Sequence, residues 1–327
     1  MVDSKQAPLD SAAAAKAAFA SVQDKPFPDD IFTAPELRWA VIGCGVIANQ
    51  MAQSLALAGR KLAGVANRTL SKAQAFAEQY GIEKVYESVE DLYADPGIDA
   101  VYITTPHNTH ITYLRDALAA GKHVLCEKAI TLNSAELDEA RAIADEHNVV
   151  LMDATTVLHM PLYQELRRRM DAGEFGRMNL AQLNFGSYKE YGDLTNRFYN
   201  RNLAGGAMLD IGVYALSVMR LFMASQPIEV VSLGNTCETG VDVAGGIVCR
   251  NAEQQLGVVG LTLHSKQPKR SIISFDKCYI EVNEYPRADH ATIVWTADGH
   301  REEVHAGTEA YALCYEMADL EKAVAGD

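Results

Sequence analysis

The sequence predicts an α/β protein in which a doubly wound parallel sheet is followed by a second α/β domain with a mostly antiparallel sheet. From Arg38 to Asp153, short β-branched runs alternate with helical patterns, which is typical of repeated βαβ units. A glycine-containing turn directly follows the first of these runs. From Ile228 onward strand-like runs dominate, which favours antiparallel pairing.

The first half of the chain contains the elements of the parallel sheet. A helix is expected over Ser71–Tyr80, and two further helices begin where Ser88 with Asp91, and Asn133 with Glu136, resemble capping boxes. The expected strands are Trp39–Ile42, Leu62–Ala66, Lys84–Tyr86, Ala100–Thr104, His123–Cys126 and Val149–Met152.

The pattern changes after Pro161. A helix through Ala172 is followed by a strand near Asn179–Phe185 and by a Gly/Asn-rich loop at Asn200–Gly206 that leads into another helix. The strands expected after that helix are Glu229–Gly234, Gly246–Cys249, Gly257–Leu263, Ser271–Phe275, Tyr279–Val282 and Thr292–Trp295.

The length of 327 residues suits two domains. We expect an N-terminal arm at 1–37, a dinucleotide-binding domain at 38–154, and a substrate-binding and oligomerisation domain at 155–327. Asp3 and Lys5 precede an alanine-rich stretch, Ala12 to Ala20, which lacks the basic start and leucine-rich core of a signal peptide. The arm is expected to be disordered or loosely helical, or alternatively to pack on a partner subunit.

Charge and composition exclude several partners. A net charge of -14 argues against nucleic acid and anionic membranes, because both would be repelled. The longest apolar runs are of strand length, so we expect no membrane span. We expect a cytoplasmic protein. Its six cysteines are scattered along the sequence without a C-x-x-C pair, so we expect reduced thiols and no metal site. The cysteines are Cys44, Cys126, Cys237, Cys249, Cys278 and Cys314.

A G-x-G-x-x-A turn connects the first strand to the next helix, and all of its residues are candidates for cofactor binding. Gly43 permits the tight turn, Gly45 lets the backbone approach a pyrophosphate, and Ala48 permits close packing of helix on strand. The N–H groups at the helix start attract the anion. A simple βα turn is the alternative. Between the motif residues stand Cys44, Val46 and Ile47.

The end of the second strand indicates which dinucleotide binds. Asn67 and Arg68 stand where an acidic residue would bind the ribose hydroxyls of NAD. A guanidinium pairs with a 2′-phosphate, so Arg68 favours NADP, with Thr69, Ser71 or Lys72 as helpers. A solvated arginine beside an NAD site remains the alternative.

The loop after the fourth strand is expected to cover the cofactor, because ligands bind at the carboxyl ends of parallel strands. Its candidate residues are Thr105, Pro106, His107 and His110. The two histidines lack a third ligand at a familiar spacing, which disfavours a metal. His110 could also be a solvent-facing residue at a helix start.

Two segments carry the candidate chemistry. Glu127 and Lys128 end the fifth strand, where an ammonium can polarise a substrate oxygen and can have its pKa lowered by burial. Asp210 and Tyr214 are four residues apart, so both face one side of a helix. A phenol is a poor base at neutral pH unless a cation lowers its pKa. Surface ion pairing and a core aromatic are the alternatives. The glycines Gly205, Gly206 and Gly212 are expected to leave space for a ligand.

In this order, the segments resemble the glucose-fructose oxidoreductase/inositol dehydrogenase family (Gfo/Idh/MocA) over roughly Arg38 to Met223. The resemblance implies a Rossmann domain, then an α/β domain whose large open sheet often forms a dimer interface, giving a homodimer or homotetramer. It also implies Lys128, Asp210 and Tyr214 as the catalytic group and as contacts of the substrate. Tyrosine at 214 favours the branch of dihydrodiol dehydrogenases, D-xylose dehydrogenases and glucose-fructose oxidoreductase.

Three departures from the family pattern stand out. Ala129 replaces the usual proline after Glu-Lys, which could loosen the peptide below the nicotinamide. Near Leu158 many relatives carry an arginine that is absent here, and His159 is either a substitute contact for the substrate or a buried histidine. The chain reaches Asp327 within or just after a helix that relatives follow with another helical segment.

The sequence therefore predicts an NADP-dependent oxidoreductase that moves hydride between nicotinamide and a hydroxyl of a sugar or cyclic diol. Tyr214 would be the proton acceptor, Lys128 the electrostatic activator and Asp210 the orienting group. A non-catalytic NADP-binding sensor or scaffold is the first alternative. An NAD-dependent glycosidase of the same family is the second.

Overall fold

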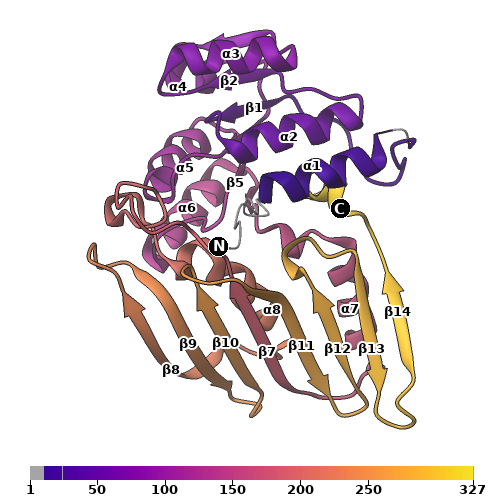
Figure 1. Ribbon diagram of the computed structural model, residues 1–327. Coiled ribbons are helices and arrows are strands. Elements are labelled where there is room, and N and C mark those ends of the chain that lie inside the picture. The colour runs from indigo at the N-terminus through magenta and orange to yellow at the C-terminus, as the bar shows by residue number, and fades with distance from the viewer. Residues whose placement is uncertain (1–10, 24, 327) are drawn as a thin grey trace, which may run out of the picture.

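Two sheets form the framework of the protein (Figure 1). The structure is a computed structural model that describes residues 11–23 and 25–326. The first sheet has the strand order β3-β2-β1-β4-β5-β6, and all of its pairs are parallel. The expected strands are confirmed to within two residues at each end. They are β1 Trp39–Ile42, β2 Gly64–Ala66, β3 Lys84–Tyr86, β4 Ala100–Ile103, β5 His123–Cys126 and β6 Leu151–Asp153.

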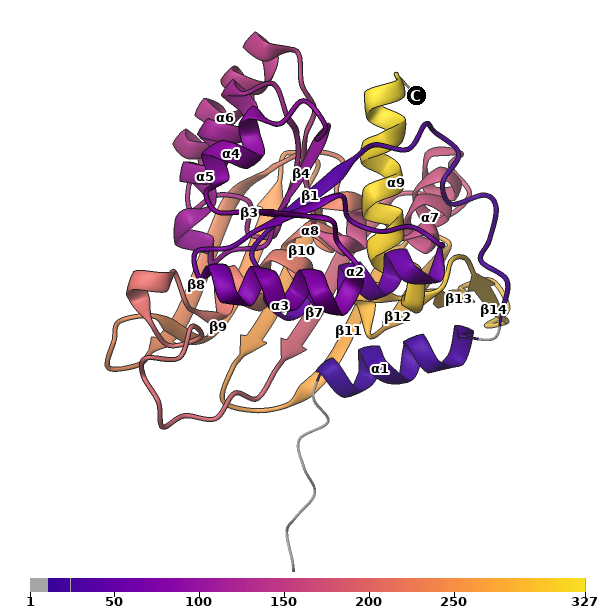
Figure 2. The same ribbon diagram turned by 90° about the horizontal axis from the view of Figure 1, so that it is seen from above.

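Helices cover both faces of this sheet, as in a doubly wound fold. The apolar side chains of α2, α3 and α9 pack on one face, and those of α4, α5 and α6 pack on the other (Figure 2). The two expected caps form, since Ser88 Oγ accepts from Asp91 N at 3.1 Å and Asn133 Oδ1 accepts from Glu136 N at 3.0 Å. The helices are α2 Val46–Leu57, α3 Leu70–Tyr80, α4 Val89–Ala94, α5 His110–Ala119, α6 Ser134–His147 and α9 Ala312–Ala325.

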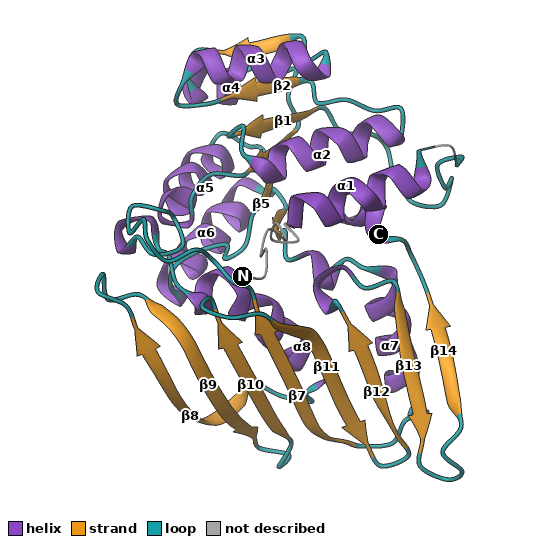
Figure 3. Cartoon of the chain, in the orientation of Figure 1, coloured by secondary structure: helices purple, strands orange, loops and turns teal. Residues whose placement is uncertain are grey.

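The second sheet has the order β14-β13-β12-β11-β7-β10-β9-β8 (Figure 3). Only the β7–β10 pair is parallel among its described pairs, so the expected antiparallel character is confirmed. One strand, β14, was not expected. The strands are β7 Met178–Gly186, β8 Pro227–Thr236, β9 Asp242–Asn251, β10 Leu256–Thr262, β11 Gln267–Phe275, β12 Cys278–Asn283, β13 His290–Trp295 and β14 Arg301–His305.

Two long helices, α7 Pro161–Asp171 and α8 Val213–Phe222, pack on one face of the second sheet (Figure 3). A π-helical turn, Met208–Gly212, leads directly into α8. The short 3-10 helices are η1 His107–Thr109, η2 Thr156–Leu158, η3 Arg201–Leu203, η5 Tyr285–Arg287 and η6 Glu309–Tyr311.

One described stretch, Arg201–Phe222, has the length and apolar composition of a membrane span, which the sequence pattern did not suggest. Half of it is buried in the protein. Val218 and Phe222 of this stretch pack in the core of the second domain. Core helices can have the same length and apolar composition as a membrane span, so this stretch is weak evidence for one.

Helix α9 belongs to both domains. Leu313, Met317 and Leu320 pack in the core of the first sheet, whereas Cys314 and Ala318 pack in the core of the second. The range expected for the second domain, 155–327, therefore contains a helix that completes the first one. Its anchor is Glu321, whose buried carboxylate accepts hydrogen bonds from Arg60 Nη1 at 2.9 and 3.0 Å, Trp39 Nε1 at 3.1 Å and Leu37 N at 3.1 Å.

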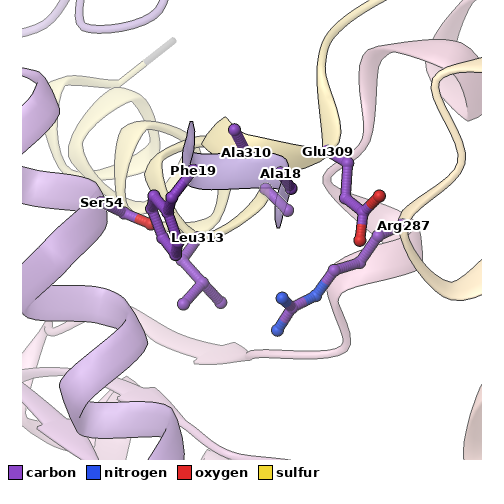
Figure 4. A pocket seen from close by; sticks show the side chains of 8 residues that line it. Ala18, Phe19, Ser54, Arg287, Glu309, Ala310 and Leu313 are labelled. Atoms are coloured by element: carbon purple, nitrogen blue, oxygen red, sulfur yellow. The ribbon is translucent and has the colours of Figure 1, made fainter. Parts of the chain in front are cut away.

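The N-terminal arm contains the helix α1 Ser11–Val22, which contacts α2 and η6 of the same chain. Residues 1–10, which include Asp3 and Lys5, lie outside the described residues. Ala18 and Phe19 of α1 close a small cavity of about 10 Å³ over Ser54, Arg287 and Glu309 (Figure 4). The described part of the arm is thus helical over Ser11–Val22, irregular over 25–37, and in contact with its own chain.

Candidate active site

The turn after β1 provides a site for a diphosphate. Gly43 has φ +103°, and a Cβ on it would lie 2.7 Å from Thr104 Oγ1, so only glycine suits this position. Gly45 precedes α2, and nothing lies within 4 Å of where its Cβ would stand. No side chain caps α2, which leaves its first N–H groups for an anion. Ala48 is fully buried against the sheet.

The other side chains of this turn have separate environments. Val46, the first residue of α2, is 68% exposed, although valine is usually buried. Ile47 packs at the edge of the first core. Burial raises the pKa of the Cys44 thiol to about 11, although Lys72 acts to lower it, so Cys44 is not a reactive thiolate.

At the end of β2, Asn67 Nδ2 donates to Thr69 O at 2.9 Å, which shapes the start of α3. Arg68, the next residue, is exposed beside this turn. The structure thus leaves its guanidinium at the carboxyl edge of the sheet, the edge where ligands bind.

The loop after β4 joins the two domains. Thr109 Oγ1 donates to Thr105 Oγ1 at 2.8 Å and to Pro106 O at 2.7 Å, which closes the loop on itself. His107 Nδ1 lies 3.2 Å from Ala204 O in the second domain. Burial and the nearby Lys128 charge lower the pKa of His107 to about 4, so this imidazole is neutral at physiological pH.

His110 is fully buried, and the interpretation as a solvent-facing residue was wrong. Its ring nitrogens lie 2.8 Å from Thr105 O and 2.9 Å from Ala129 O. The imidazole therefore fixes the β4 loop against the segment that follows Lys128. The peptide bond between Lys128 and Ala129 is cis.

Lys128, Asp210 and Tyr214 come together at the junction of the two domains. Lys128 Nζ lies 2.6 Å from the backbone oxygen of Asp210 and 3.5 Å from its Oδ1. The same ammonium stands over the Tyr214 ring, 4.8 Å from the ring centroid. The spacing of four residues thus brings both side chains to one cation, as expected from the sequence.

The charge states in this group differ in part from the expectation. Burial acts to lower the pKa of Lys128, but Tyr214, Asp210 and Glu127 outweigh burial and raise it, so the ammonium persists. Burial would raise the pKa of Asp210, but Lys128 and Arg197 outweigh it and lower that pKa. Burial raises the pKa of Tyr214 above its usual range against the effect of Lys128. The site therefore holds an ammonium, a carboxylate and a neutral phenol at neutral pH.

The glycines beside Asp210 serve packing, not space for a ligand as expected. A Cβ on Gly205 would lie 2.5 Å from Arg197 O, and one on Gly206, which has φ +118°, would lie 2.2 Å from Asp242 Oδ1. A Cβ on Gly212 would lie 2.9 Å from Leu261 Cδ1. These glycines let the π-helical turn lie close to the sheet.

Glu127 directly follows β5 and is partly buried. Its Oε1 accepts from Tyr102 Oη at 2.5 Å, and its Oε2 accepts from Lys128 N at 3.2 Å. Burial raises the pKa of this carboxyl despite both hydrogen bonds. Glu127 is therefore held by its own domain beside Lys128.

His159 lies outside this group, and the expected contact with the substrate is not supported. It is buried, with Nδ1 2.8 Å from Asp319 Oδ2 and Nε2 2.8 Å from Asp153 O. Both ring nitrogens are thus engaged within the chain, in the manner of the buried histidine that was the alternative interpretation.

Two neighbours of the site were missed. Arg197 Nη1 and Nη2 each lie 3.4 Å from Asp210 Oδ1, and this side chain is 54% exposed at the mouth of the site. Glu316 on α9 is fully buried behind the site. In the sequence, Glu316 stands between Tyr315 and Met317 on a helix that also carries Asp319, Glu321 and Lys322, so little distinguished it, and nothing marked Arg197.

Comparison with known proteins identifies the architecture. The GFO_IDH_MocA family, described as an oxidoreductase family with an NAD-binding Rossmann fold, matches residues 37–155, and its C-terminal domain, GFO_IDH_MocA_C3, matches residues 163–281. The chain belongs to the Gfo/Idh/MocA family of oxidoreductases. It is an NAD(P)-dependent dehydrogenase acting on CH–OH groups. A sensor or scaffold without turnover is thereby set aside.

Individual relatives of this oxidoreductase agree. It is 32% identical over 254 residues to trans-1,2-dihydrobenzene-1,2-diol dehydrogenase from Mus musculus, covering 76% of this chain and 75% of that protein. Levoglucosan dehydrogenase in complex with NADH and levoglucosan shares the fold with TM-score 0.80 at 20% identity, over 89% of this chain and 90% of that chain. UDP-N-acetylglucosamine 3-dehydrogenase from Acidithiobacillus ferrooxidans is 25% identical with TM-score 0.75, over 89% of both chains.

We expect Gly43→Ala to weaken NAD(P) binding by more than about tenfold, because the added methyl strains φ and displaces the β4 loop. A fluorescence titration with each dinucleotide measures the dissociation constant. The matched control is Gly59→Ala, which also has positive φ (+69°) but has nothing within 4 Å of its Cβ position. Equal effects of both substitutions on NAD(P) binding would contradict a specific role for the turn.

Proposed function

We propose that this oxidoreductase is NADP-dependent and acts on a hydroxyl or carbonyl carbon of a sugar or cyclic diol. The observation that supports this most is the Lys128–Asp210–Tyr214 group beside the diphosphate turn. Such a group combines a fixed positive charge with a proton donor and acceptor, which hydride transfer at a CH–OH carbon requires.

Each side chain in this group has one task. Lys128, held by Asp210, stabilises negative charge that develops on the substrate oxygen. Tyr214 gives its proton to that oxygen in reduction and receives it in oxidation. When bound, the nicotinamide supplies the acceptor or donor carbon for the hydride. Because burial raises the pKa of Tyr214, the phenol form prevails at neutral pH and suits carbonyl reduction, whereas the phenolate that oxidation needs is favoured at alkaline pH.

The preference for NADP rests on Arg68. It is exposed at the end of β2, with Lys72 in the following helix, and both add positive charge where a 2′-phosphate would bind. Gly43, Gly45 and the start of α2 would hold the diphosphate. Solved structures of similar fold include a 3-ketoreductase from Actinomadura kijaniata in complex with NADP and levoglucosan dehydrogenase in complex with NADH, so the fold alone favours neither dinucleotide.

Three features support a small polyhydroxylated substrate. The relatives named above act on a dihydrodiol, on levoglucosan and on a nucleotide sugar. Asp210 offers a carboxylate that can accept hydrogen bonds from vicinal hydroxyls. Arg197 stands at the mouth, where it can donate to a substrate oxygen.

We also propose that the open face of the second sheet joins two copies of the chain. Apolar side chains gather where β8, β9 and β10 pair, with Leu233 at 84%, Val231 at 71%, Val248 at 47% and Leu256 at 40% exposure. Contiguous exposed apolar surface of this kind typically marks a protein interface. A homodimer would cover it.

Lys128→Met should lower kcat/KM by about 10²–10⁴-fold and leave NADP affinity little changed, because the site loses its fixed positive charge. Tyr214→Phe should cause a similar loss through the missing proton donor. NADPH absorbance, with pentoses, hexoses and trans-dihydrodiols as substrates, gives the rates. Lys61→Met, which removes an exposed partner of Glu83, is the control. Persistent turnover in Lys128→Met would refute the proposed site.

Arg68→Ala should raise the KM for NADP by about tenfold or more and leave the KM for NAD unchanged, because only NADP carries the 2′-phosphate. Initial rates with each dinucleotide test this. Arg141→Ala removes a comparably solvated guanidinium on α6, 64% exposed, and should change neither constant. A parallel rise with NAD and NADP would show that Arg68 does not select the cofactor.

Leu233→Glu should convert a dimer to a monomer, because a charge would be buried without a partner in the apolar contact. Light scattering after gel filtration measures the mass. Leu132→Glu places the same charge on an apolar residue of another surface, 39% exposed, and should keep the dimer. A dimer that survives Leu233→Glu would place the interface elsewhere.

A further inference from the structure

A row of ionisable side chains runs behind Lys128, between the two domains. It begins with Glu127 at the end of β5 and Tyr102 on β4, passes Glu316 on α9, and ends with His159 and Asp319. Tyr102 and Glu316 are fully buried, and His159 is 7% exposed. None of these side chains belongs to the proposed catalytic group, so their burial calls for an explanation.

Glu316 is the least satisfied of them. Thr156 approaches it, yet neither carboxyl oxygen forms a hydrogen bond within the described part of the chain. A buried carboxylate without donors is strongly disfavoured, whereas a protonated carboxyl is tolerated. Burial raises the pKa of Glu316 to about 8, with a further rise from Glu127. Glu316 therefore holds a proton at neutral pH.

Glu127 has the opposite surroundings. It accepts hydrogen bonds from Tyr102 Oη and Lys128 N, and both favour its charged form. The charge of Glu127 raises the pKa of Glu316. The charge of Glu316 in turn raises the pKa of Tyr102, the hydrogen-bond partner of Glu127. Two carboxyls that interact in this way titrate together and not as independent groups.

The far end of the row reaches solvent. Glu316 and Asp319 are three residues apart on α9, and the Asp319 side chain is 23% exposed. His159 Nδ1 lies 2.8 Å from Asp319 Oδ2. Burial would lower the pKa of His159, but Asp319 and Glu316 outweigh it and raise that pKa, which favours the protonated imidazole.

Other charged groups also face this row. Arg287 of η5, which donates to Gln50 Oε1 at 3.0 Å, lowers the pKa of both Glu127 and Glu316. Asp153 of β6 is raised in pKa mainly by its own burial, and it accepts from Thr155 Oγ1 at 2.6 Å. On the catalytic side, the charge of Glu127 raises the pKa of Tyr214. The row is thus electrostatically linked to the proposed proton donor and acceptor.

We propose that Glu127 and Glu316 are a proton store for the reaction, exchanging with solvent through His159 and Asp319; this rests on the function proposed above. In oxidation, the substrate O–H bond would break with its proton passing to Tyr214, and the C–H bond would break with its electron pair leaving as hydride, for which a bound nicotinamide would supply the acceptor. As Tyr214 gives up its own proton, the pair gains one. It then releases one through His159 to water, which balances the single proton of the reaction. Reduction runs in the opposite direction.

The kinetic test is Glu316→Gln, in which an amide of the same shape can neither take up nor release a proton. We expect kcat for oxidation to fall by about tenfold or more with an unchanged KM for NADP. The solvent deuterium isotope effect on kcat should rise, and the ionisation near pH 8 should leave the pH profile. Wild-type kcat, isotope effect and pH profile in this variant would overturn the proposal.

The matched control is Glu321→Gln, which alters another buried glutamate of α9 that is paired with Arg60. It should lower the melting temperature and leave the isotope effect and pH profile unchanged. Asp319→Asn tests the outer end, is partly exposed, and should also raise the isotope effect. It decides the question if Glu316→Gln does not fold, and an unaltered isotope effect would then refute the exchange route.

A stability measurement separates failure of this proposal from failure of the proposed function. The folded pKa of Glu316, about 8, exceeds its usual value of 4.5, so the folded state binds the extra proton between these values. That stabilisation is complete below pH 4.5 and is lost as the pH rises through 8. Wild-type melting temperature should fall more steeply than that of Glu316→Gln from pH 5 to 8. Parallel curves would refute the stored proton, whether or not any substrate is turned over.

Discussion

Lys128 ends a strand of the first domain, and the backbone oxygen that binds its ammonium at 2.6 Å belongs to Asp210 of the second. This contact sets the distance between the cofactor turn and the helix that carries Tyr214. It also keeps a lysine charged at a largely buried position, which the chain could not do without a nearby acceptor and carboxylate. His107 strengthens the same junction through Ala204, whereas His110 fixes the segment after Lys128 within the first domain through Ala129.

The electrostatics of the junction follow from unequal pairing. Asp210 has two cations within ion-pair distance, Lys128 and Arg197, and Glu127 has hydrogen-bond donors, whereas the two oxygens of Glu316 have no hydrogen-bond partner among the described residues. Burial alone would make all three carboxyls neutral, so the distribution of donors decides which of them is charged. Asp210, Glu127 and Glu316 thus lie near the same active site in three different electrostatic environments. Such contrasts between ionisable groups are more typical of functional sites than of groups that only stabilise a fold.

The sequence predicted the parts of the fold that have a local signal. Buried strands such as Ala100–Ile103 contain β-branched and aromatic residues between turn signals, so their positions could be identified. β14 was missed because Arg301, Glu302 and Glu303 give it a charged pattern, which suits an edge strand but hides it in the sequence.

The site was predictable in its residue types and less so in its environment. Lys128, Asp210 and Tyr214 could be identified from motif order, and their convergence was found. The π-helical turn, the burial of His159 and the raised pKa of Tyr214 depend on packing between distant segments, which one sequence does not display. Glu316 shows the same limit, since only the position of α9 tells a buried carboxyl from a solvated one.

Helix α9 has a consequence for how the protein is made. Leu313, Met317 and Leu320 leave the ribosome only after all eight strands of the second sheet, yet they complete the core of the domain that is synthesised before that sheet. The six-stranded sheet therefore waits with one face partly uncovered while the whole second domain emerges, a time of order ten seconds or more at ordinary rates of translation. The first domain cannot finish folding alone, and cutting the gene between the two domains would leave both halves exposed to aggregation.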